Sequence, residues 1–186
     1  MGFDLSGINP KINKDVSHYK YYSEDSDLWA SKDKKLRKKY FKDMDNYFDD
    51  NPGVYFRNNV WWWRPLWDFV CLQCNDFMTD EQKEGGAYND GKLIDQETAA
   101  KIGTKLEILL KNGTVKRWEK RITTINEEIK EKYTTYGVPK SSSGTRGLSH
   151  MPILEDERFS ANYPFSQDNV ENFAKFCLES GGFEIC

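Results

Sequence analysis

Apolar residues recur every three or four positions in several long segments of the chain, and this spacing is typical of helices with one buried face. These segments are residues 27–48, 63–77, 95–112 and 114–132, with a shorter one after Ser166. Residues 2–9 instead alternate apolar and polar side chains as a strand does, and residues 54–60 form a second extended segment. The pattern predicts an α+β fold: a small sheet with an N-terminal strand, packed by four or five helices and predominantly helical.

Two of the expected helices are marked at both ends by the residues that usually begin and end helices. Asp95 and Ser166 are natural N-caps, and each follows an apolar residue that can pack against the first turn. The pair Asn112 and Gly113 ends the first of these helices, and Gly181 ends the second. The sequence alone therefore bounds both helices.

The chain of 186 residues is near the usual size of one domain, so we expect a single domain over residues 1–186. Within it, residues 11–53 read as an insertion that contains the helix at 27–48. Four aspartates crowd the end of that helix, where the helix dipole disfavours negative charge, so we expect an appendage with a frayed end. Residues 134–162 are rich in Ser, Gly and Pro and predict a long flexible loop.

Charge and hydropathy exclude several classes of protein. A formal net charge of −3 argues against a protein whose main partner is a nucleic acid. No apolar run approaches the ~18 residues that a membrane span needs, and the N-terminus lacks the pattern of a signal peptide. We therefore expect a soluble cytoplasmic protein that has no membrane partner and whose four cysteines are reduced.

The densest chemistry lies between Arg57 and Arg64, where two arginines, two asparagines and three tryptophans occupy eight residues. Tryptophan stacks on a base, a guanidinium binds phosphate, and asparagine offers a donor and an acceptor. Consecutive residues cannot all face one way, so Trp63 is assigned to the core and Trp61 or Trp62 to partial exposure. The candidate ligand-binding residues here are Arg57, Asn58, Asn59, Trp61, Trp62 and Arg64. The alternative is that all three tryptophans are core and the arginines are structural.

The Ser/Gly-rich loop is a natural companion to this cluster. Its hydroxyls, backbone amides and one cation have the chemistry to cover a phosphate as a lid, which adds Ser143, Thr145 and Arg146 to the candidate ligand-binding residues. The loop is not a Walker loop, because the Gly-Lys-Ser/Thr ending is missing. The alternative is a surface loop without a role in binding.

The sequence gives little support for a metal site or a catalytic site. Cys71 and Cys74 have the CxxC spacing but lie on the apolar face of an expected helix, without a second pair, so they read as core cysteines. Residues 86–97 resemble a calcium loop that lacks carboxylates at its first and third positions. The only histidines are His18 and His150, and no nucleophile is paired with either. We expect no metal and no cofactor; whether the protein is an enzyme stays open, and a non-catalytic role is favoured.

Three segments together resemble a known family. They are Met1–Pro10, the run Tyr-Phe-Arg-Asn-Asn-Val-Trp-Trp-Trp-Arg-Pro-Leu-Trp at 55–67, and residues 164–186 with the ending Ser-Gly-Gly-Phe-Glu-Ile-Cys. With Asn89-Asp90-Gly91 and the helix after it, they resemble a family of small uncharacterised proteins of bacteria and their phages. The family has no assigned chemistry, so the resemblance carries over no functional residues; it implies the host cytoplasm if a phage encodes the chain. This chain departs from the family in its enlarged insertion at 11–53 and in lacking a cysteine pair near residue 145.

Two classes of function follow. The first is non-catalytic binding of a small phosphorylated or nucleotide-like ligand, which in a phage protein would mean sequestering a host defence signal. The alternative is a protein–protein interaction module, an inhibitor or assembly factor acting on a host protein. It rests on the split charge of helix 27–48, basic and then acidic, and on aromatics expected to be exposed at Tyr19, Tyr21 and Tyr22. A homo-oligomer stays open, and an enzyme of unrecognised type is the third alternative.

Overall fold

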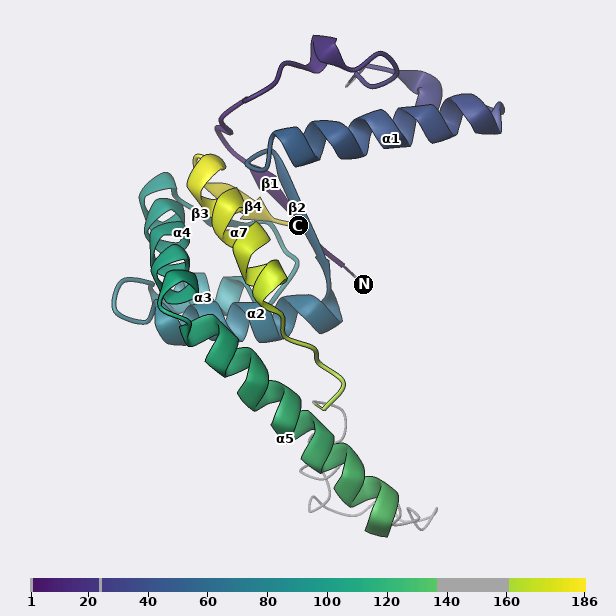
Figure 1. The fold of residues 1–186 in the computed structure, drawn as a ribbon. Coiled ribbons are helices and arrows are strands. Elements are labelled where there is room, and N and C mark those ends of the chain that lie inside the picture. Colours follow the sequence, from purple (N-terminus) through teal and green to yellow (C-terminus); the bar gives the residue numbers. More distant parts are fainter. Residues whose placement is uncertain (1, 24, 137–160) are drawn as a thin grey trace, which may run out of the picture.

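The computed structural model describes residues 2–23, 25–136 and 161–186. Four antiparallel strands form one sheet in the order β2-β1-β4-β3, and the described residues also form six α-helices, of which α1 and α5 extend away from the sheet (Figure 1). The strands are β1 (Gly2–Gly7), β2 (Tyr55–Asn59), β3 (Lys92–Ile94) and β4 (Phe183–Ile185). The helices are α1 (Lys34–Asp50), α2 (Val60–Gln73), α3 (Asp80–Gly85), α4 (Gln96–Lys111), α5 (Thr114–Tyr136) and α7 (Gln167–Glu179), with short 3-10 helices at Val16–His18 and Asp27–Ala30. The predicted, predominantly helical α+β fold is confirmed.

The sheet has one apolar face and one polar face. In β1 the buried Phe3 and Leu5 alternate with Gly2, Asp4 and Ser6, as a strand with one covered side requires. The register places Leu5 beside both Phe56 and Ile185, so the apolar side chains of neighbouring strands share the covered face. Burial of this face against the helices forms the main core.

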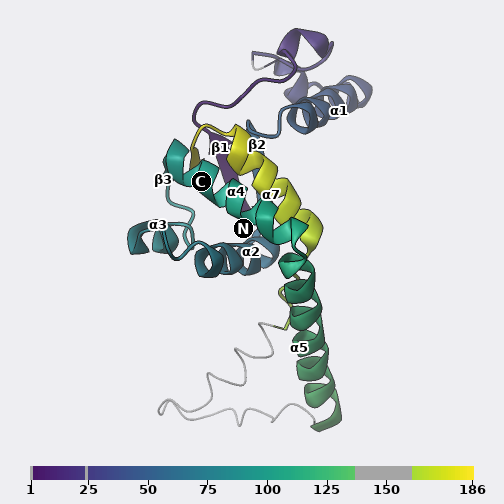
Figure 2. The same ribbon diagram turned by 60° about the vertical axis from the view of Figure 1, so that its left-hand side comes forward.

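Helices α4 and α7 lie side by side over the core (Figures 1 and 2). Their close approach depends on Gly103, where an added Cβ would lie 2.6 Å from Leu178 and 3.0 Å from the carbonyl oxygen of Ala174. A glycine in mid-helix lowers helix propensity, yet here it lets two backbones pack closely. The packing of α4 on α7 thus explains a residue that local propensity disfavours.

The centre of the core is aromatic. Trp63 is fully buried between Phe3 and Trp67, with ring centroids 5.4 and 5.2 Å away, and the nearly perpendicular ring of Phe173 has its centroid 5.7 Å away. Its indole N–H donates to the carbonyl oxygen of Gly86 at 2.7 Å, so the one polar atom of the ring is satisfied. The prediction that Trp63 belongs to the core is confirmed.

The caps predicted for two helices are confirmed. Asp95 accepts a hydrogen bond from the Thr98 amide, and Ser166 accepts one from the Asn169 amide. Gly181, which follows the last turn of α7, has φ +62°, a conformation that favours glycine. Capping side chains act within three residues of their own position, and this explains why the sequence reveals them.

Other boundaries differ from the predictions. The helix expected at 27–48 begins only at Lys34, because Asp33 caps it and residues 27–30 form a separate 3-10 turn. Helix α2 begins at Val60, so Pro65 lies in its second turn and not in the first as expected. Helix α3 and strand β3 were not predicted, although Thr79 and Gln82 form a capping box that marks the start of α3. Helix α5 extends to Tyr136, into the start of the expected loop at 134–162.

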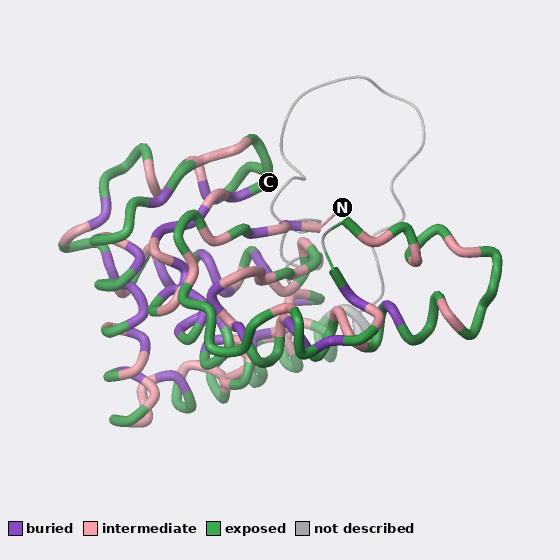
Figure 3. Tube along the Cα trace, turned by 90° about the horizontal axis from the view of Figure 1, so that it is seen from above, coloured by how far each residue is buried: buried purple, intermediate pink, exposed green. Residues whose placement is uncertain are grey.

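Residues 11–53 form an appendage, here called the arm, which occupies the connection between β1 and β2 and projects away from the sheet (Figures 1 and 2). It has a small core of its own, made by the buried rings of Tyr19, Tyr22, Tyr40 and Tyr47. The other buried apolar residues form the main core in the body of the molecule, and Figure 3 shows most buried positions there. The expectation that Tyr19 and Tyr22 are exposed is therefore wrong: they pack against α1, and Tyr21 is half-buried.

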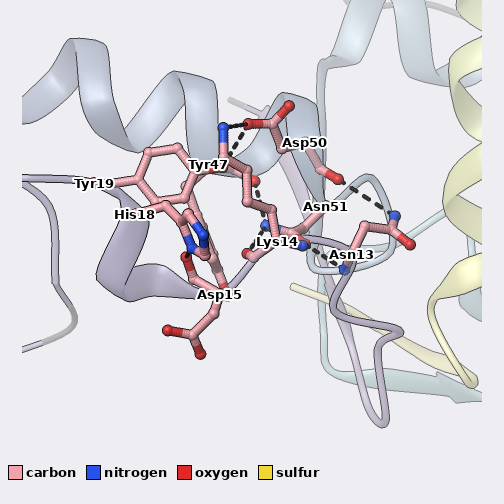
Figure 4. Close-up of polar contacts among 8 residues, drawn as sticks. All are labelled: Asn13, Lys14, Asp15, His18, Tyr19, Tyr47, Asp50 and Asn51. Carbon is pink, nitrogen blue, oxygen red and sulfur yellow. Dashed lines mark hydrogen bonds and ion pairs between the residues drawn. The ribbon is translucent and has the colours of Figure 1, made fainter.

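The base of the arm is held by Asn51, whose side chain is fully buried and fully hydrogen-bonded (Figure 4). Its Oδ1 accepts from the amides of Asn13 and Lys14 at 2.7 and 2.9 Å. Its Nδ2 donates to the carbonyl oxygens of Lys14 and Tyr47, both at 2.9 Å. The Asn51 amide also continues the backbone bonds of α1, so the end of this helix is fixed and the expected fraying is wrong.

Further contacts tie the arm to the body. Asn13 Nδ2 donates to Glu179 Oε2 at 2.7 Å, and the Lys11 amide donates to the Glu179 carbonyl oxygen at 2.8 Å. Gly53 passes so close to α7 that an added Cβ would lie 2.2 Å from that same oxygen. The arm is thus attached to the body at both of its ends.

Candidate functional site

The run from Arg57 to Arg64 spans the end of β2 and the start of α2, and Asn59 makes the junction. Asn59 Oδ1 accepts from the amides of Trp61 and Trp62 at 3.0 and 3.1 Å, which caps α2. The change from strand to helix sends consecutive side chains in different directions. Asn59 therefore has a structural task that accounts for its presence in the run.

Arg57 lies on the polar face of the sheet. Its Nε is 3.3 Å from Asp4 Oδ1, and its side chain stays two-thirds exposed (66%). The hydroxyl of Tyr55 donates to the same carboxylate, and burial together with this hydrogen bond raises the pKa of Tyr55 to about 12. Tyr55 therefore remains protonated at neutral pH, and the guanidinium keeps donors open to solvent.

Asn58 faces the opposite side and joins β2 to α7. Its Nδ2 donates to Asn169 Oδ1 at 3.0 Å, and Asn169 Nδ2 donates in turn to the Trp62 carbonyl oxygen at 3.4 Å. Asn169 lies in the first turn of α7, so this chain of amides fixes α2 relative to α7. Asn58 is half-buried and its amide group is engaged within the fold.

The exposed Trp61 and Arg64 and the half-buried Tyr163 form a compact group, here called the Trp61 surface. The rings of Trp61 and Tyr163 are 5.0 Å apart, and Arg64 Nη1 donates to the Tyr163 hydroxyl at 3.2 Å. Trp61 and Arg64 are exposed, whereas Trp62 is half-buried. An aromatic pair with a guanidinium on the same surface has the chemistry to bind a flat anionic ligand.

A cavity of about 220 Å³ adjoins the Trp61 surface, between α5 and the chain that leads into α7. Asn126 links the two features, since it lines the cavity and donates to the Tyr163 carbonyl oxygen at 3.1 Å. The cavity is lined by Ile122, Thr123, Asn126, Glu127, Lys130, Ala161, Asn162, Pro164 and Phe165. This volume is below the ~300 Å³ at which small-molecule pockets usually begin, so it suits part of a ligand.

The structure thus divides the candidate residues that the sequence grouped together. Trp61 and Arg64 share a surface, while Arg57 pairs with Asp4 on the polar face of the sheet. Ser143, Thr145 and Arg146 lie outside the described residues. Sequence reasoning missed Tyr163 and Asn126, because long-range packing alone brings them to the tryptophans and no local motif marks either one.

The cysteines do not form a reactive site. Burial raises the pKa of Cys71 to about 11 and that of Cys74 to about 12, and it also raises the pKa of the buried Cys177 well above its usual value. Such thiols stay protonated and unreactive at neutral pH. No group of side chains within residues 2–23, 25–136 and 161–186 is placed to hold a metal ion. His18 Nδ1 lies 3.0 Å from the Asp15 carbonyl oxygen, so this ring nitrogen already has a hydrogen-bond partner in its own turn.

The arm presents a second candidate surface. Trp29 and Phe41 are large apolar side chains with exposed fractions of 57% and 42%. Helix α1 and the segment before it also carry a set of exposed basic side chains that form no ion pair with any described carboxylate. The set comprises Lys32, Lys34, Lys35, Arg37, Lys38 and Lys42. Lys39 differs, because its Nζ donates to the Tyr21 hydroxyl at 3.2 Å and lies over the Tyr21 ring, which lowers the pKa of Tyr21.

Comparisons with models of protein families, with curated proteins and with solved structures find no match to this chain. Among the described helices, none has the length and apolar character needed to cross a membrane. The geometry of the two surfaces is therefore the basis for any functional inference.

Proposed function

We propose that this protein is a protein–protein interaction module whose contact surface is the outer side of the arm. The observation that carries the proposal is that Trp29 and Phe41 are exposed on an arm whose exposed basic side chains at 32–38 and 42 form no ion pair among the described residues. Tryptophan, tyrosine and arginine are enriched at the energetic centres of protein interfaces, and aromatic residues in general are enriched at interface cores, whereas complementary charges steer the partner and set its orientation. The arm has its own core of buried tyrosines, separate from the main core, so its outer side chains are free of any role in packing the main core.

The attachment of the arm supports the same proposal. Asn51, Gly53 and the contacts to Glu179 fix the arm at its base, and the tyrosine core fixes its interior. A fixed surface loses little conformational entropy when it binds, so it gains affinity relative to a loose segment with the same side chains. A role in presenting a surface to a partner would explain why the projecting arm is fixed by so many contacts.

Truncating the two exposed aromatics is the direct test. Tagged and untagged copies are expressed together, and the proteins captured with the tag are identified by mass spectrometry. We expect Trp29→Ala/Phe41→Ala to reduce capture of the partner about tenfold or more, since two interface aromatics are lost. The matched control is Leu72→Ala/Ile108→Ala, which truncates two side chains of similar exposure (57% and 53%) on the body. Equal capture by both double variants would refute the arm as the contact surface.

The Trp61 surface favours a second candidate, binding of a small phosphorylated or nucleotide-like ligand. Its support is the exposed ring of Trp61 beside Tyr163, the guanidinium of Arg64 on the same hydroxyl, and the adjoining cavity. Stacking of a base on an aromatic ring and a charge-assisted contact to phosphate are the interactions such a ligand needs. Under this proposal the protein holds the ligand without altering it.

Two arginine variants separate this candidate from the first. Native mass spectrometry with added nucleoside monophosphates and cyclic dinucleotides should show a bound mass on the unaltered chain. Arg64→Ala is expected to weaken binding roughly tenfold to a hundredfold, the size of one charge-assisted contact. Arg57→Ala, the same change on the polar face of the sheet, should leave binding unchanged. Equal losses in both variants would show that the ligand does not sit on the Trp61 surface alone.

A further inference from the structure

We propose that the partner of the arm is a second copy of this chain, joined through an antiparallel pair of α1 helices. This inference rests on the proposed function and names the partner. The surface that carries it is one exposed side of α1, here called the α1 stripe, formed by Lys34, Lys38, Phe41, Asp45 and Asp49.

The α1 stripe has an ordered sequence of charge. Its members are three or four residues apart, so they follow one side of the helix, away from the buried Tyr40 and Tyr47. Two lysines come first, the ring of Phe41 lies in the middle, and two aspartates follow. Lys35 lies beside the first half of the stripe and Lys42 beside its centre, and both are exposed. The stripe is therefore bipolar, with an apolar residue at its centre.

This order of charge is unfavourable in a single helix. The dipole of a helix favours acidic residues at the N-terminal end and basic residues at the C-terminal end. Helix α1 has the reverse order, with no acidic residue in its first turn and no basic residue in its last. Among the described residues, none of the four charged members of the stripe forms an ion pair. Asp33 caps the first turn and Lys14 pairs with Asp50 in the last, but within the described residues no ion pair reaches the four charges of the stripe itself.

A second α1 helix in antiparallel orientation pairs all four charges of the stripe. Lys34 then lies opposite Asp49 and Lys38 opposite Asp45, and the two-fold axis repeats each pair. The pairs match because they are placed symmetrically about residues 41 and 42, which puts Phe41 beside the axis next to its counterpart. Each basic half also lies along the carboxyl end of the other helix, where the dipole is negative. An isologous contact of this kind is the usual way that identical chains associate.

The bipolar order selects this partner over others. A uniformly acidic surface would attract the lysines but be repelled by Asp45 and Asp49, and a uniformly basic surface would suffer the opposite conflict. A matching partner must present acidic residues opposite Lys34 and Lys38 and basic residues opposite Asp45 and Asp49. A second copy of α1 in antiparallel orientation does so. The arm projects away from the sheet in two views, which leaves α1 accessible along its length (Figures 1 and 2).

The dimer is expected to be weak and sensitive to salt. Helix α1 has 17 residues and is therefore about 25 Å long, and one helix pair of this length makes a small interface. Exposed ion pairs are screened by salt, so dimerisation should weaken as ionic strength rises. Sedimentation equilibrium of the full chain at low ionic strength should show a monomer–dimer equilibrium.

Charge reversal tests the pairing. Lys34→Glu/Lys38→Glu and Asp45→Lys/Asp49→Lys each turn four attractive pairs into repulsive ones. An exposed pair contributes a factor of about 1.5 to 5 in affinity. Each double variant should therefore have a dimer dissociation constant at least about tenfold higher than that of the unaltered chain. An equimolar mixture of the two should form a heterodimer, and the chain with all four substitutions should dimerise like the unaltered protein. Each reversal also suits the helix dipole better, so α1 should stay folded, which far-UV circular dichroism verifies.

Several results would overturn the inference. It fails if the unaltered chain stays monomeric at every concentration at low ionic strength, if either double variant dimerises as the unaltered chain does, or if the mixture stays monomeric. In the capture experiment, arm-dependent recovery of a different protein without the untagged copy would refute the second copy and leave the proposed function standing. The absence of any arm-dependent capture would refute both.

Discussion

Replacing Trp63 with alanine is expected to lower the free energy of unfolding by about 3–5 kcal/mol, the usual cost of removing a large aromatic from a core. The side chain is fully buried among Phe3, Trp67 and Phe173. Its loss also leaves the carbonyl oxygen of Gly86 without its donor. Since small domains are stable by only about 5–15 kcal/mol, much of the total stability would be lost.

Trp61→Ala is the matched control, because it makes the same chemical change two residues away at a side chain that is 37% exposed. We expect a loss of about 1 kcal/mol or less, mostly from the ring contact with Tyr163. Urea unfolding should be followed by far-UV circular dichroism. Tryptophan fluorescence is unsuitable because each variant loses a different indole, one buried and one partly exposed. Similar losses for the two variants would contradict the assignment of Trp63 to the centre of the core.

Replacing Asn51 with leucine is expected to destabilise the protein by about 2–4 kcal/mol and to release the base of the arm. Four hydrogen bonds to a fully buried side chain are lost, and two amides and two carbonyl oxygens are left without this partner. The first effect should be seen in hydrogen exchange. The amides of Asn13 and Lys14, which donate to Asn51, should exchange much faster than in the unaltered chain.

Asn46→Leu controls for the change in chemistry, since it makes the same substitution on an exposed position of the same helix. Its effect on stability should stay within about 0.5 kcal/mol, as is usual for surface positions. If the Asn13 and Lys14 amides keep their protection in Asn51→Leu, then backbone contacts alone hold the arm. The contacts of Glu179 would then be the place to look next.

The sequence predicts those features of the fold that local chemistry determines. Asp95 and Ser166 act on amides three residues away, so their helices can be located without knowledge of the rest of the chain. Strands β3 and β4 have three residues each; β3 is held by pairing with β4, and β4 by pairing with β1 as well, which no local pattern reveals. Asn51 reads as an ordinary turn residue, and its role becomes visible only when residues 13 and 14 are brought beside it.

The candidate site shows the same division. The aromatic and basic residues from Arg57 to Arg64 were recognised as dense in chemistry, and the alternation argument placed Trp63 in the core correctly. The grouping of Arg57 with Arg64 did not anticipate that Asn59 ends a strand and begins a helix at this point. The contribution of Tyr163 depends on how the chain returns from α5 to α7, and this return is set by tertiary packing.

The position of the arm between β1 and β2 has a consequence for how the chain folds. These two strands are antiparallel neighbours, so the arm serves as the loop of a hairpin, and their pairing must close residues 8–54. Closing a long loose loop costs entropy, and contacts between distant residues slow folding. If the tyrosine core and the Asn51 bonds form first, the two ends of the loop are already together, and the strands meet as in a short hairpin. The arm would then speed the folding of a sheet to which it contributes no strand.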